Sequence, residues 1–186
     1  MKDIKNAETN PLLKQHMFDT YECAEAAFQH IKWIYISMER PGLPILSDLA
    51  MEQFRSADGE KAFQLSRALD QQFPNTYHSQ WQNGLRDQVM WMILNIKFKN
   101  PALKTLLNST GESFLIEHNN RPGKDKHWSD NHDGSGDNAL GLMLMAIRAG
   151  QTQMPIVTDQ HKQMNRQKLS QVNQFISQYS IFKIII

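Results

Sequence analysis

The chain has 186 residues, of which 40% are hydrophobic and 21% are charged, a composition typical of a folded globular protein and not of a disordered one. Its formal net charge of +1 excludes a strong overall field for nucleic acid or anionic lipid, although a local patch can still bind an anion. The single cysteine, Cys23, excludes an internal disulfide and favours a reducing compartment. The first ten residues lack the apolar core of a signal peptide, and the longest apolar runs are too short to span a bilayer. We therefore expect a soluble, cytoplasmic protein without a membrane partner.

Apolar residues recur at helical spacing through the first part of the chain, between segments rich in Pro and Gly. The helices that this pattern predicts cover residues 23–37, 46–55, 60–72, 82–99 and 101–108. We expect the apolar stripes of these helices, with Phe63 and Ile96 among them, to face the core. Asn100 and Pro101 separate the last two helices, because a residue before proline avoids the helical conformation and proline suits the first helical position.

The second part of the chain begins with the best strand candidate, residues 113–118. Residues 119–136 form a long loop rich in Gly, Asn, Asp and His, and long irregular loops in compact domains are often functional. A helix is expected to resume near Asp137, with Asp137 or Asn138 as its N-cap.

These elements predict a predominantly helical α+β fold, a multihelical single domain with a small β element. Residues 1–16 are expected to be a polar arm and residues 17–150 the domain. Residues 151–186 are expected to pack on the domain as a helix near 158–178 followed by an apolar tail. The tail either pairs as an edge strand, packs into a groove or forms an interface between subunits, and the oligomeric state stays open.

A first chemical constellation is Glu25, Gln29 and Lys32, whose i, i+4 and i+7 spacing places them on one stripe of one helix. A carboxylate held there can act as a base or nucleophile towards an electrophilic carbon, and an amine can neutralise charge or attack as a free amine. On spacing alone, a solvated helix face with an ordinary charge pattern is the simpler interpretation.

The long loop carries a second constellation with three open interpretations. Its possible metal ligands are His127, Asp130, His132 and Asp133. Their spacing matches no helical or cysteine-containing zinc site. The glycines before Asn138 suggest instead that backbone N–H groups at a helix start bind an anion. A solvated loop is the third interpretation. The ring of Trp128 in this loop either packs on the fold or stacks on a ligand.

Segments that follow one another in order resemble the NADAR, or YbiA-like, family. They are YECAEAAFQHIKW at 21–33, WQNGLRDQVM at 81–90, LLNSTG at 106–111, FLIEH at 114–118 and HWSDNHDGSGDNALGLMLMAIR at 127–148. The first segment contains the family's E-x-x-x-Q-x-x-K pattern. The family's W-G-D-G reads Trp128-Ser129-Asp130-Asn131 here, so Ser129 and Asn131 replace two glycines. Residues 1–16 show no counterpart of the family's N-terminal aromatic-Ser-Asn-Phe segment.

The resemblance implies a YbiA-like fold and an N-glycosidase that hydrolyses a ribosyl C–N bond, with no metal or organic cofactor. The substrates that it implies are phosphoribosylamino-pyrimidine intermediates of riboflavin synthesis, or ADP-ribosyl-guanine, which includes ADP-ribosylated nucleic acid. The alternative is a catalytically degenerate module that binds ADP-ribose or a related nucleotide.

The resemblance also assigns site residues. Glu25 and Lys32 are the expected catalytic groups. The expected substrate-binding residues are Gln29, Trp81, Glu117, Trp128, Asp130 and Asn138. Among these, Asp130 or Glu117 is suited to hold ribose hydroxyls, Trp128 to stack on the base, and the glycine-rich turn before Asn138 to meet a phosphate.

Overall fold

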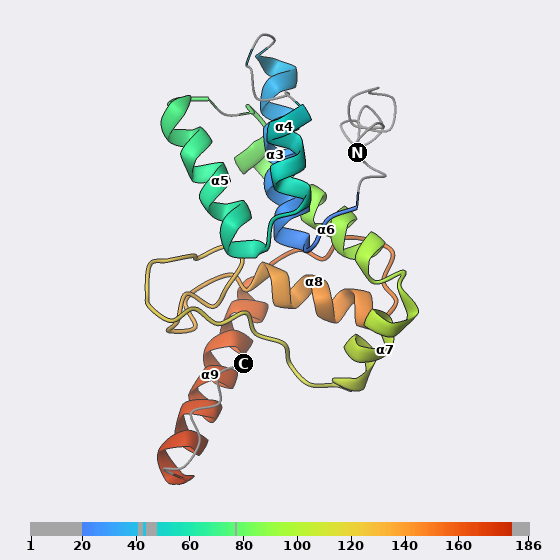
Figure 1. The fold of residues 1–186 in the computed structure, drawn as a ribbon. Coiled ribbons are helices and arrows are strands. Elements are labelled where there is room, and N and C mark those ends of the chain that lie inside the picture. Colours follow the sequence, from blue (N-terminus) through green and yellow to red (C-terminus); the bar gives the residue numbers. More distant parts are fainter. Residues whose placement is uncertain (1–19, 41–42, 44–47, 77, 180–186) are drawn as a thin grey trace. The chain divides into compact units, whose positions relative to one another are not determined.

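A computed structural model describes residues 20–40, 43, 48–76 and 78–179 of the chain (Figure 1). The described residues are predominantly helical, as predicted, and no β-strand occurs among them. The chain divides into two compact units, unit 1 from Met1 to Lys97 and unit 2 from Phe98 to Ile186. This division falls inside the predicted domain 17–150, whose own boundaries stay predictions.

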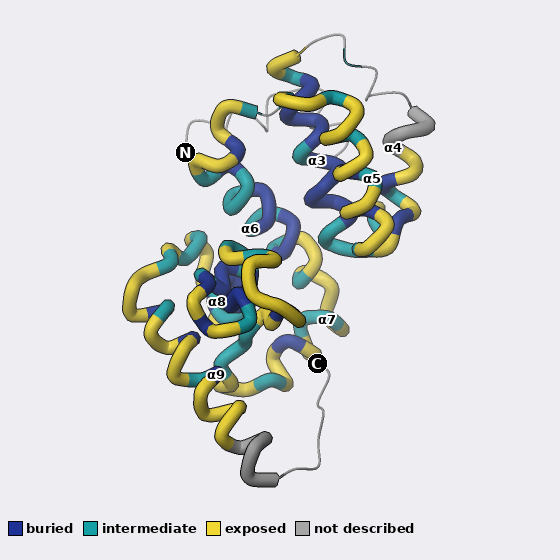
Figure 2. Tube along the Cα trace, turned by 90° about the vertical axis from the view of Figure 1, so that its left-hand side faces the viewer, coloured by how far each residue is buried: buried dark blue, intermediate teal, exposed yellow. Residues whose placement is uncertain are grey.

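Unit 1 is a group of helices around one central helix, α3. Its elements are α3 (Ala24–Glu39), α4 (Asp48–Arg55), α5 (Gly59–Gln72), the π-helical turn η2 (Trp81–Leu85) and α6 (Arg86–Lys97). Helix α3 contacts α4, α5 and α6, and it is dark blue along most of its length in Figure 2. Residues 26–31 and 33–37 are all buried, so α3 is a core helix enclosed on nearly every side and not only an amphipathic one.

Side-chain caps and one glycine set the helix boundaries of unit 1. The Cys23 Sγ accepts a hydrogen bond from Ala26 N (3.4 Å) at the start of α3, and Asp58 Oδ1 accepts one from Lys61 N (2.8 Å) at the start of α5. The predicted helix 82–99 differs from the observed one. Gly84, with φ of 100°, takes a conformation that only glycine adopts readily, and the chain forms the turn η2 before α6 begins.

Two large side chains predicted to face the core, Phe63 and Ile96, do not, and Ala68 of the same predicted stripe as Phe63 is also exposed. Phe63 is 42% exposed and Ile96 is 46% exposed. Helix α5 buries Ala62 and Ser66, and Phe63 lies one residue off this stripe, where the guanidinium of Arg67 covers its ring at 5.7 Å. Ile96 is the penultimate residue of α6, so the buried stripe of that helix ends before it.

Unit 2 contains three described helices, α7 (Pro101–Ser109), α8 (Ala139–Arg148) and α9 (Asp159–Tyr179). Asn100 caps α7 through a hydrogen bond from Ala102 N (2.9 Å), and Pro101 takes the first helical position as predicted. Helix α7 packs on α8, and Lys104 Nζ donates to Ile147 O (2.6 Å) near the end of α8. The C-terminal helix was predicted at 158–178, close to its observed bounds.

The predicted strand 113–118 has no regular secondary structure, so the small β element is unconfirmed. The polar arm 1–16 and the apolar tail from residue 180 lie outside the described residues. Within the described part of the chain, no helix combines the length and the apolar character needed to cross a membrane.

His161 makes the stability of unit 2 depend on pH. The side chain is 7% exposed, and its ring packs on Phe114 with 5.7 Å between centroids. Burial lowers the pKa of the imidazole from its ordinary value of 6.5, although backbone bonds to Asn138 and Asp137 act the other way. The unfolded chain therefore binds this proton more tightly. The contribution of His161 to stability is complete above pH 6.5 and is lost as pH falls from there through the lowered folded pKa.

We expect the urea midpoint of the protein to fall between about pH 7.5 and about pH 5 by more than that of His161→Gln, which carries no titrating group there. Urea unfolding followed by circular dichroism at each pH gives both midpoints. The two proteins contain the same carboxylates, so an equal fall in both would contradict this prediction.

Candidate functional site

The Glu25 carboxylate is oriented by its neighbour one turn along α3. Gln29 is 8% exposed, and its Nε2 donates to Glu25 Oε1 at 2.8 Å. The Gln29 Oε1 is buried and accepts no hydrogen bond from the described residues. Glu25 itself is half-buried. These burials contradict the interpretation of this stripe as an ordinary solvated face, and they leave Glu25 with a fixed orientation.

Lys32 is tied to α5. Its Nζ donates to Ser66 Oγ and to both carboxylate oxygens of Asp70, each at 3.1 Å, and its side chain is 18% exposed. Trp33 Nε1 donates to the same Ser66 oxygen at 3.0 Å. In this arrangement the ammonium group is available as a charge, whereas an attack by the amine requires release of Asp70 and loss of a proton.

Trp81 lies in the core of unit 1. Its side chain is 8% exposed, and its ring packs on Phe28 of α3 with 5.3 Å between centroids. The ring therefore supports the helix that carries Glu25. This placement favours packing over the substrate contact predicted from the sequence.

Asn138 joins three segments of unit 2. Its side chain is fully buried; Oδ1 accepts from Glu117 N, and Nδ2 donates to Leu115 O, both at 2.9 Å. Nδ2 also contacts Asn165 Oδ1 of α9 at 3.1 Å. Asn138 occupies the predicted N-cap position of α8, but it is left-handed with φ of 49° and makes no side-chain cap bond. Its amide makes the hydrogen bonds to the backbone of residues 115–117 that a neighbouring strand would otherwise make. The backbone N–H of residue 117 and the carbonyl of residue 115 therefore have partners without a sheet.

The N-terminus of α8 does not provide an anion site. Asn138 N, Ala139 N and Leu140 N donate to the carbonyl oxygens of residues 129, 127 and 128, at 2.9, 3.0 and 3.2 Å. A Cβ at Gly136 would clash with Ser129 O, so this glycine permits a close approach of two backbones. These bonds occupy the amides that the anion interpretation requires, and the structure does not support a phosphate at this turn.

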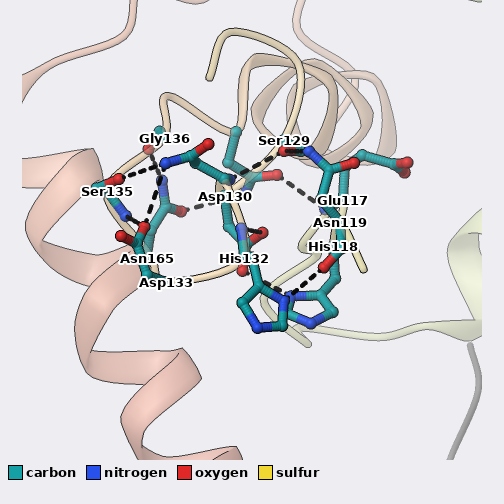
Figure 3. Close-up of polar contacts among 12 residues, drawn as sticks. Glu117, His118, Asn119, Ser129, Asp130, His132, Asp133, Ser135, Gly136 and Asn165 are labelled. Carbon is teal, nitrogen blue, oxygen red and sulfur yellow. Dashed lines mark hydrogen bonds and ion pairs between the residues drawn. The ribbon is translucent and has the colours of Figure 1, made fainter. Parts of the chain in front are cut away.

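Asp130 is fully buried and accepts hydrogen bonds inside the loop (Figure 3). Its Oδ2 lies 2.8 Å from His118 Nδ1, and its Oδ1 accepts from His132 N at 2.9 Å. This placement favours the positioning of other groups over the predicted contact with ribose hydroxyls.

The two residues that replace family glycines fit the loop. Ser129 Oγ, also fully buried, donates to Asp125 O at 2.6 Å. Asn131 has φ of 60°, a conformation that Asn tolerates better than most residues other than glycine. Its Oδ1 accepts from Gly123 N at 2.7 Å. The loop therefore keeps a left-handed residue at the position of the second glycine.

Glu117 and Trp128 are the predicted unit 2 residues that retain accessible side chains. Glu117 is exposed and Trp128 is half-buried. The Trp128 ring meets His127 edge-on at 4.6 Å between centroids. His118, 47% exposed, was not predicted as a site residue, although it ends the FLIEH segment that carries part of the family resemblance.

The metal interpretation of the loop gains no support from geometry. In the described part of the chain, no group of three or more His, Cys, Asp or Glu side chains is placed to hold a metal ion. His127 instead contacts Asp137 at 3.4 Å, and His132 Nδ1 lies 2.8 Å from Asn119 O.

Comparison with known proteins decides the family. Residues 3–150 match the NADAR domain. The chain belongs to the NADAR family. The match begins inside the segment predicted to be an arm without a family counterpart.

Several curated relatives share part of their length with this chain. A riboflavin biosynthesis protein of Vibrio vulnificus is 37% identical over 99 residues, which cover 50% of this chain and 24% of that protein. The chloroplastic riboflavin biosynthesis protein PYRR of Zea mays is 30% identical over 107 residues, 57% of this chain and 16% of that protein. The N-glycosidase YbiA of Escherichia coli is 38% identical over 69 residues, 37% of this chain and 41% of that protein. The chain thus spans less than half of each relative. No solved structure matches it.

The hydrogen bonds from the Asn138 side chain to residues 115 and 117, called here the Asn138 clamp, are testable through Gly141 of α8. A Cβ at Gly141 would clash with Leu115 O and press on the Asn138 amide. We expect Gly141→Ala to lower the free energy of unfolding by about 1–3 kcal/mol, the usual cost of overpacking. In Gly59→Ala, the matched control at the start of α5, the nearest atom to the new Cβ is 3.7 Å away. Urea unfolding should show the control unchanged or slightly stabilised; an unchanged Gly141→Ala would contradict the clamp.

Proposed function

We propose that this NADAR protein is an N-glycosidase that hydrolyses a ribosyl C–N bond. The observation that carries the proposal is the half-buried Glu25 carboxylate, fixed by Gln29 at 2.8 Å. Cleavage of a ribosyl C–N bond builds positive charge on the anomeric carbon, and a fixed carboxylate stabilises that charge or activates the attacking water. The N-glycosidase name of a relative that is 38% identical over 69 residues supports the same chemistry.

The substrate belongs to one of two classes, a phosphoribosylamino-pyrimidine or an ADP-ribosyl-guanine. The riboflavin biosynthesis names of two relatives support the first class. Either class contains a ribosyl carbon, the target proposed for Glu25. Either class also contains a planar base, and the half-buried ring of Trp128 is of a kind that stacks on such bases. The exposed carboxylate of Glu117 is suited to accept hydrogen bonds from ribose hydroxyls.

The rival proposal is a degenerate module that binds ADP-ribose without cleaving it. Two departures from the family pattern raise this rival: the N-terminal aromatic-Ser-Asn-Phe segment has no counterpart in residues 1–16, and Ser129 and Asn131 replace two glycines. The left-handed Asn131, with φ of 60°, preserves the backbone conformation that glycine would supply, and this supports the hydrolase over the degenerate module.

Glu25 is testable by a substitution that keeps its shape. We expect Glu25→Gln to lower kcat by about 100-fold or more, because the neutral amide neither stabilises the cationic carbon nor accepts a proton from water. Glu22→Gln, an exposed neighbour before α3, is the matched control and should retain full activity. Release of the free base from the pyrimidine intermediate, and from an oligonucleotide bearing ADP-ribosylated guanine, is measured by liquid chromatography with mass spectrometry.

The same assay separates the competing interpretations. Release of base from either substrate establishes the N-glycosidase and identifies its substrate class. Binding of ADP-ribose without release from either substrate would replace the hydrolase with the degenerate module. Unchanged turnover in Glu25→Gln would remove Glu25 from the catalytic role.

Lys32 has two chemical roles that one trapping experiment distinguishes. As a nucleophile, its amine would condense with the opened sugar aldehyde, lose water and form an imine that borohydride reduces to a stable adduct. Because Lys32 Nζ donates to both Asp70 oxygens at 3.1 Å, we propose that it acts as a fixed charge. We expect no sugar adduct on the Lys32 peptide after borohydride treatment during turnover. An adduct there, absent from Lys32→Met, would establish the imine route.

A further inference from the structure

Helices α3 and α5 of unit 1 run next to each other in the same direction (Figure 1). Near the start of both, a Cβ added to Gly59 would lie 3.7 Å from the Cβ of Glu25. Seven residues further along each helix, Lys32 Nζ donates to Ser66 Oγ at 3.1 Å. The two helices are therefore in register between these two contacts, and equal steps along α3 and α5 stay level with each other.

Phe63 lies on α5 between these two contacts. It follows Gly59 by four residues and precedes Ser66 by three, a spacing that places all three along one side of the helix. The ring is nevertheless 42% exposed, so it lies at the margin of the α3–α5 contact and not within it. This margin is a surface of unit 1 that a ligand can reach, about 6 Å along the helix axis from the level of Glu25.

Arg67 follows Phe63 by one helical turn and covers its ring. The guanidinium carbon lies 5.7 Å from the ring centroid, a distance at which a cation is attracted to an aromatic face. Helical side chains lean towards the N-terminus of their helix, so the guanidinium extends back to the turn that carries Phe63. The cation is thus oriented towards the end of α5 that contacts Glu25.

The charge of Arg67 is not neutralised within the described part of the chain. The side chain is exposed, and it forms no ion pair or hydrogen bond with any described residue. Asp70, the nearest acidic residue in α5, is already held by Lys32 through both carboxylate oxygens at 3.1 Å. A guanidinium that rests on a ring and has no anion keeps its N–H donors available for a phosphate or carboxylate.

We propose that Arg67 binds the 5-phosphate of the ribosyl substrate, with Phe63 as its positioning residue. This inference rests on the proposed function and adds a phosphate-binding residue to it. In both substrate classes the ribosyl group carries a phosphate on its 5-carbon, and one sugar ring separates that phosphate from the carbon at which the C–N bond breaks. That separation is comparable to the rise of about 6 Å between the levels of Glu25 and Phe63. A phosphate on Arg67 therefore leaves the reacting carbon level with the Glu25 carboxylate.

Binding measurements test this site without requiring turnover. Isothermal titration calorimetry of the full chain compares ribose 5-phosphate with ADP-ribose. We expect Arg67→Met to weaken binding of at least one of these ligands by about 10- to 100-fold, the usual range for a hydrogen-bonded contact to a charged group. Lys61→Met, which removes an exposed cation from another face of α5, is the matched control and should bind as the unsubstituted protein does.

The role of Phe63 is tested by a double-variant cycle. Phe63→Leu keeps an apolar side chain but removes the aromatic face, and it should weaken binding of the same ligand by about 2- to 5-fold. The double variant should bind no more weakly than Arg67→Met alone, because Phe63 acts through Arg67. Additive losses would instead assign Phe63 a structural role or a contact of its own. Both side chains are exposed, so we expect the circular dichroism spectra of all variants to be unchanged.

Turnover separates the phosphate site from the proposed hydrolysis. On a substrate that the protein cleaves, Arg67→Met should raise KM with a smaller change in kcat, whereas Glu25→Gln should lower kcat. A loss of affinity confined to ribose 5-phosphate would identify the phosphoribosyl class, and one confined to ADP-ribose the ADP-ribosyl class. Equal affinity of Arg67→Met and the unsubstituted protein for both ligands, or binding of neither ligand, would overturn this inference alone. Binding that depends on Arg67 without cleavage of either substrate would overturn the proposed hydrolysis and leave Arg67 as a phosphate-binding residue.

Discussion

The fully buried amide of Asn138 is the interaction on which unit 2 depends. A buried amide that loses its partners costs about 1–3 kcal/mol per unsatisfied group, and this one bonds to residues 115 and 117 and to Asn165 of α9. Asn165 Nδ2 in turn donates to Gly136 O at 3.2 Å. The Asn138 side chain, directly or through Asn165, therefore connects the irregular segment 115–117, the end of the long loop and helices α8 and α9. These contacts fix the conformation of the loop.

The fixed loop explains how polar side chains can be buried there at acceptable cost. Ser129, Asp130 and Asn138 are fully buried, and each forms hydrogen bonds within unit 2. A satisfied network of this kind rigidifies a structure, whereas a partly satisfied one destabilises it. The accessible groups, Glu117, His118 and the half-buried Trp128, extend from this network. The buried residues fix the backbone of the loop, and the exposed ones are suited to meet a ligand.

The helices were predicted well from the sequence, because hydrophobic periodicity, capping residues and prolines determine helix positions through residues close together in the chain. Pro101 and Asn100 marked the start of α7. The i, i+4 spacing placed Glu25 and Gln29 on one stripe of α3, and the structure adds the hydrogen bond between them. The predicted strand at 113–118 does not form, for a reason that lies far away in the sequence. Its backbone forms hydrogen bonds with the side chain of Asn138, more than twenty residues further along the chain. The pairing of His118 with Asp130 likewise depends on loop geometry that no spacing rule encodes.

Because α3 is enclosed on nearly every side, few amino-acid substitutions along it can be tolerated. Residues 26–31 and 33–37 leave little room for substitution, since well-packed interiors tolerate few changes of volume. Engineering of ligand preference therefore has little scope along this helix. The exposed positions 120–122 and 124 of the long loop offer more freedom, because replacements there disturb no core packing. Sequence drift among descendants of this chain should concentrate in the same place.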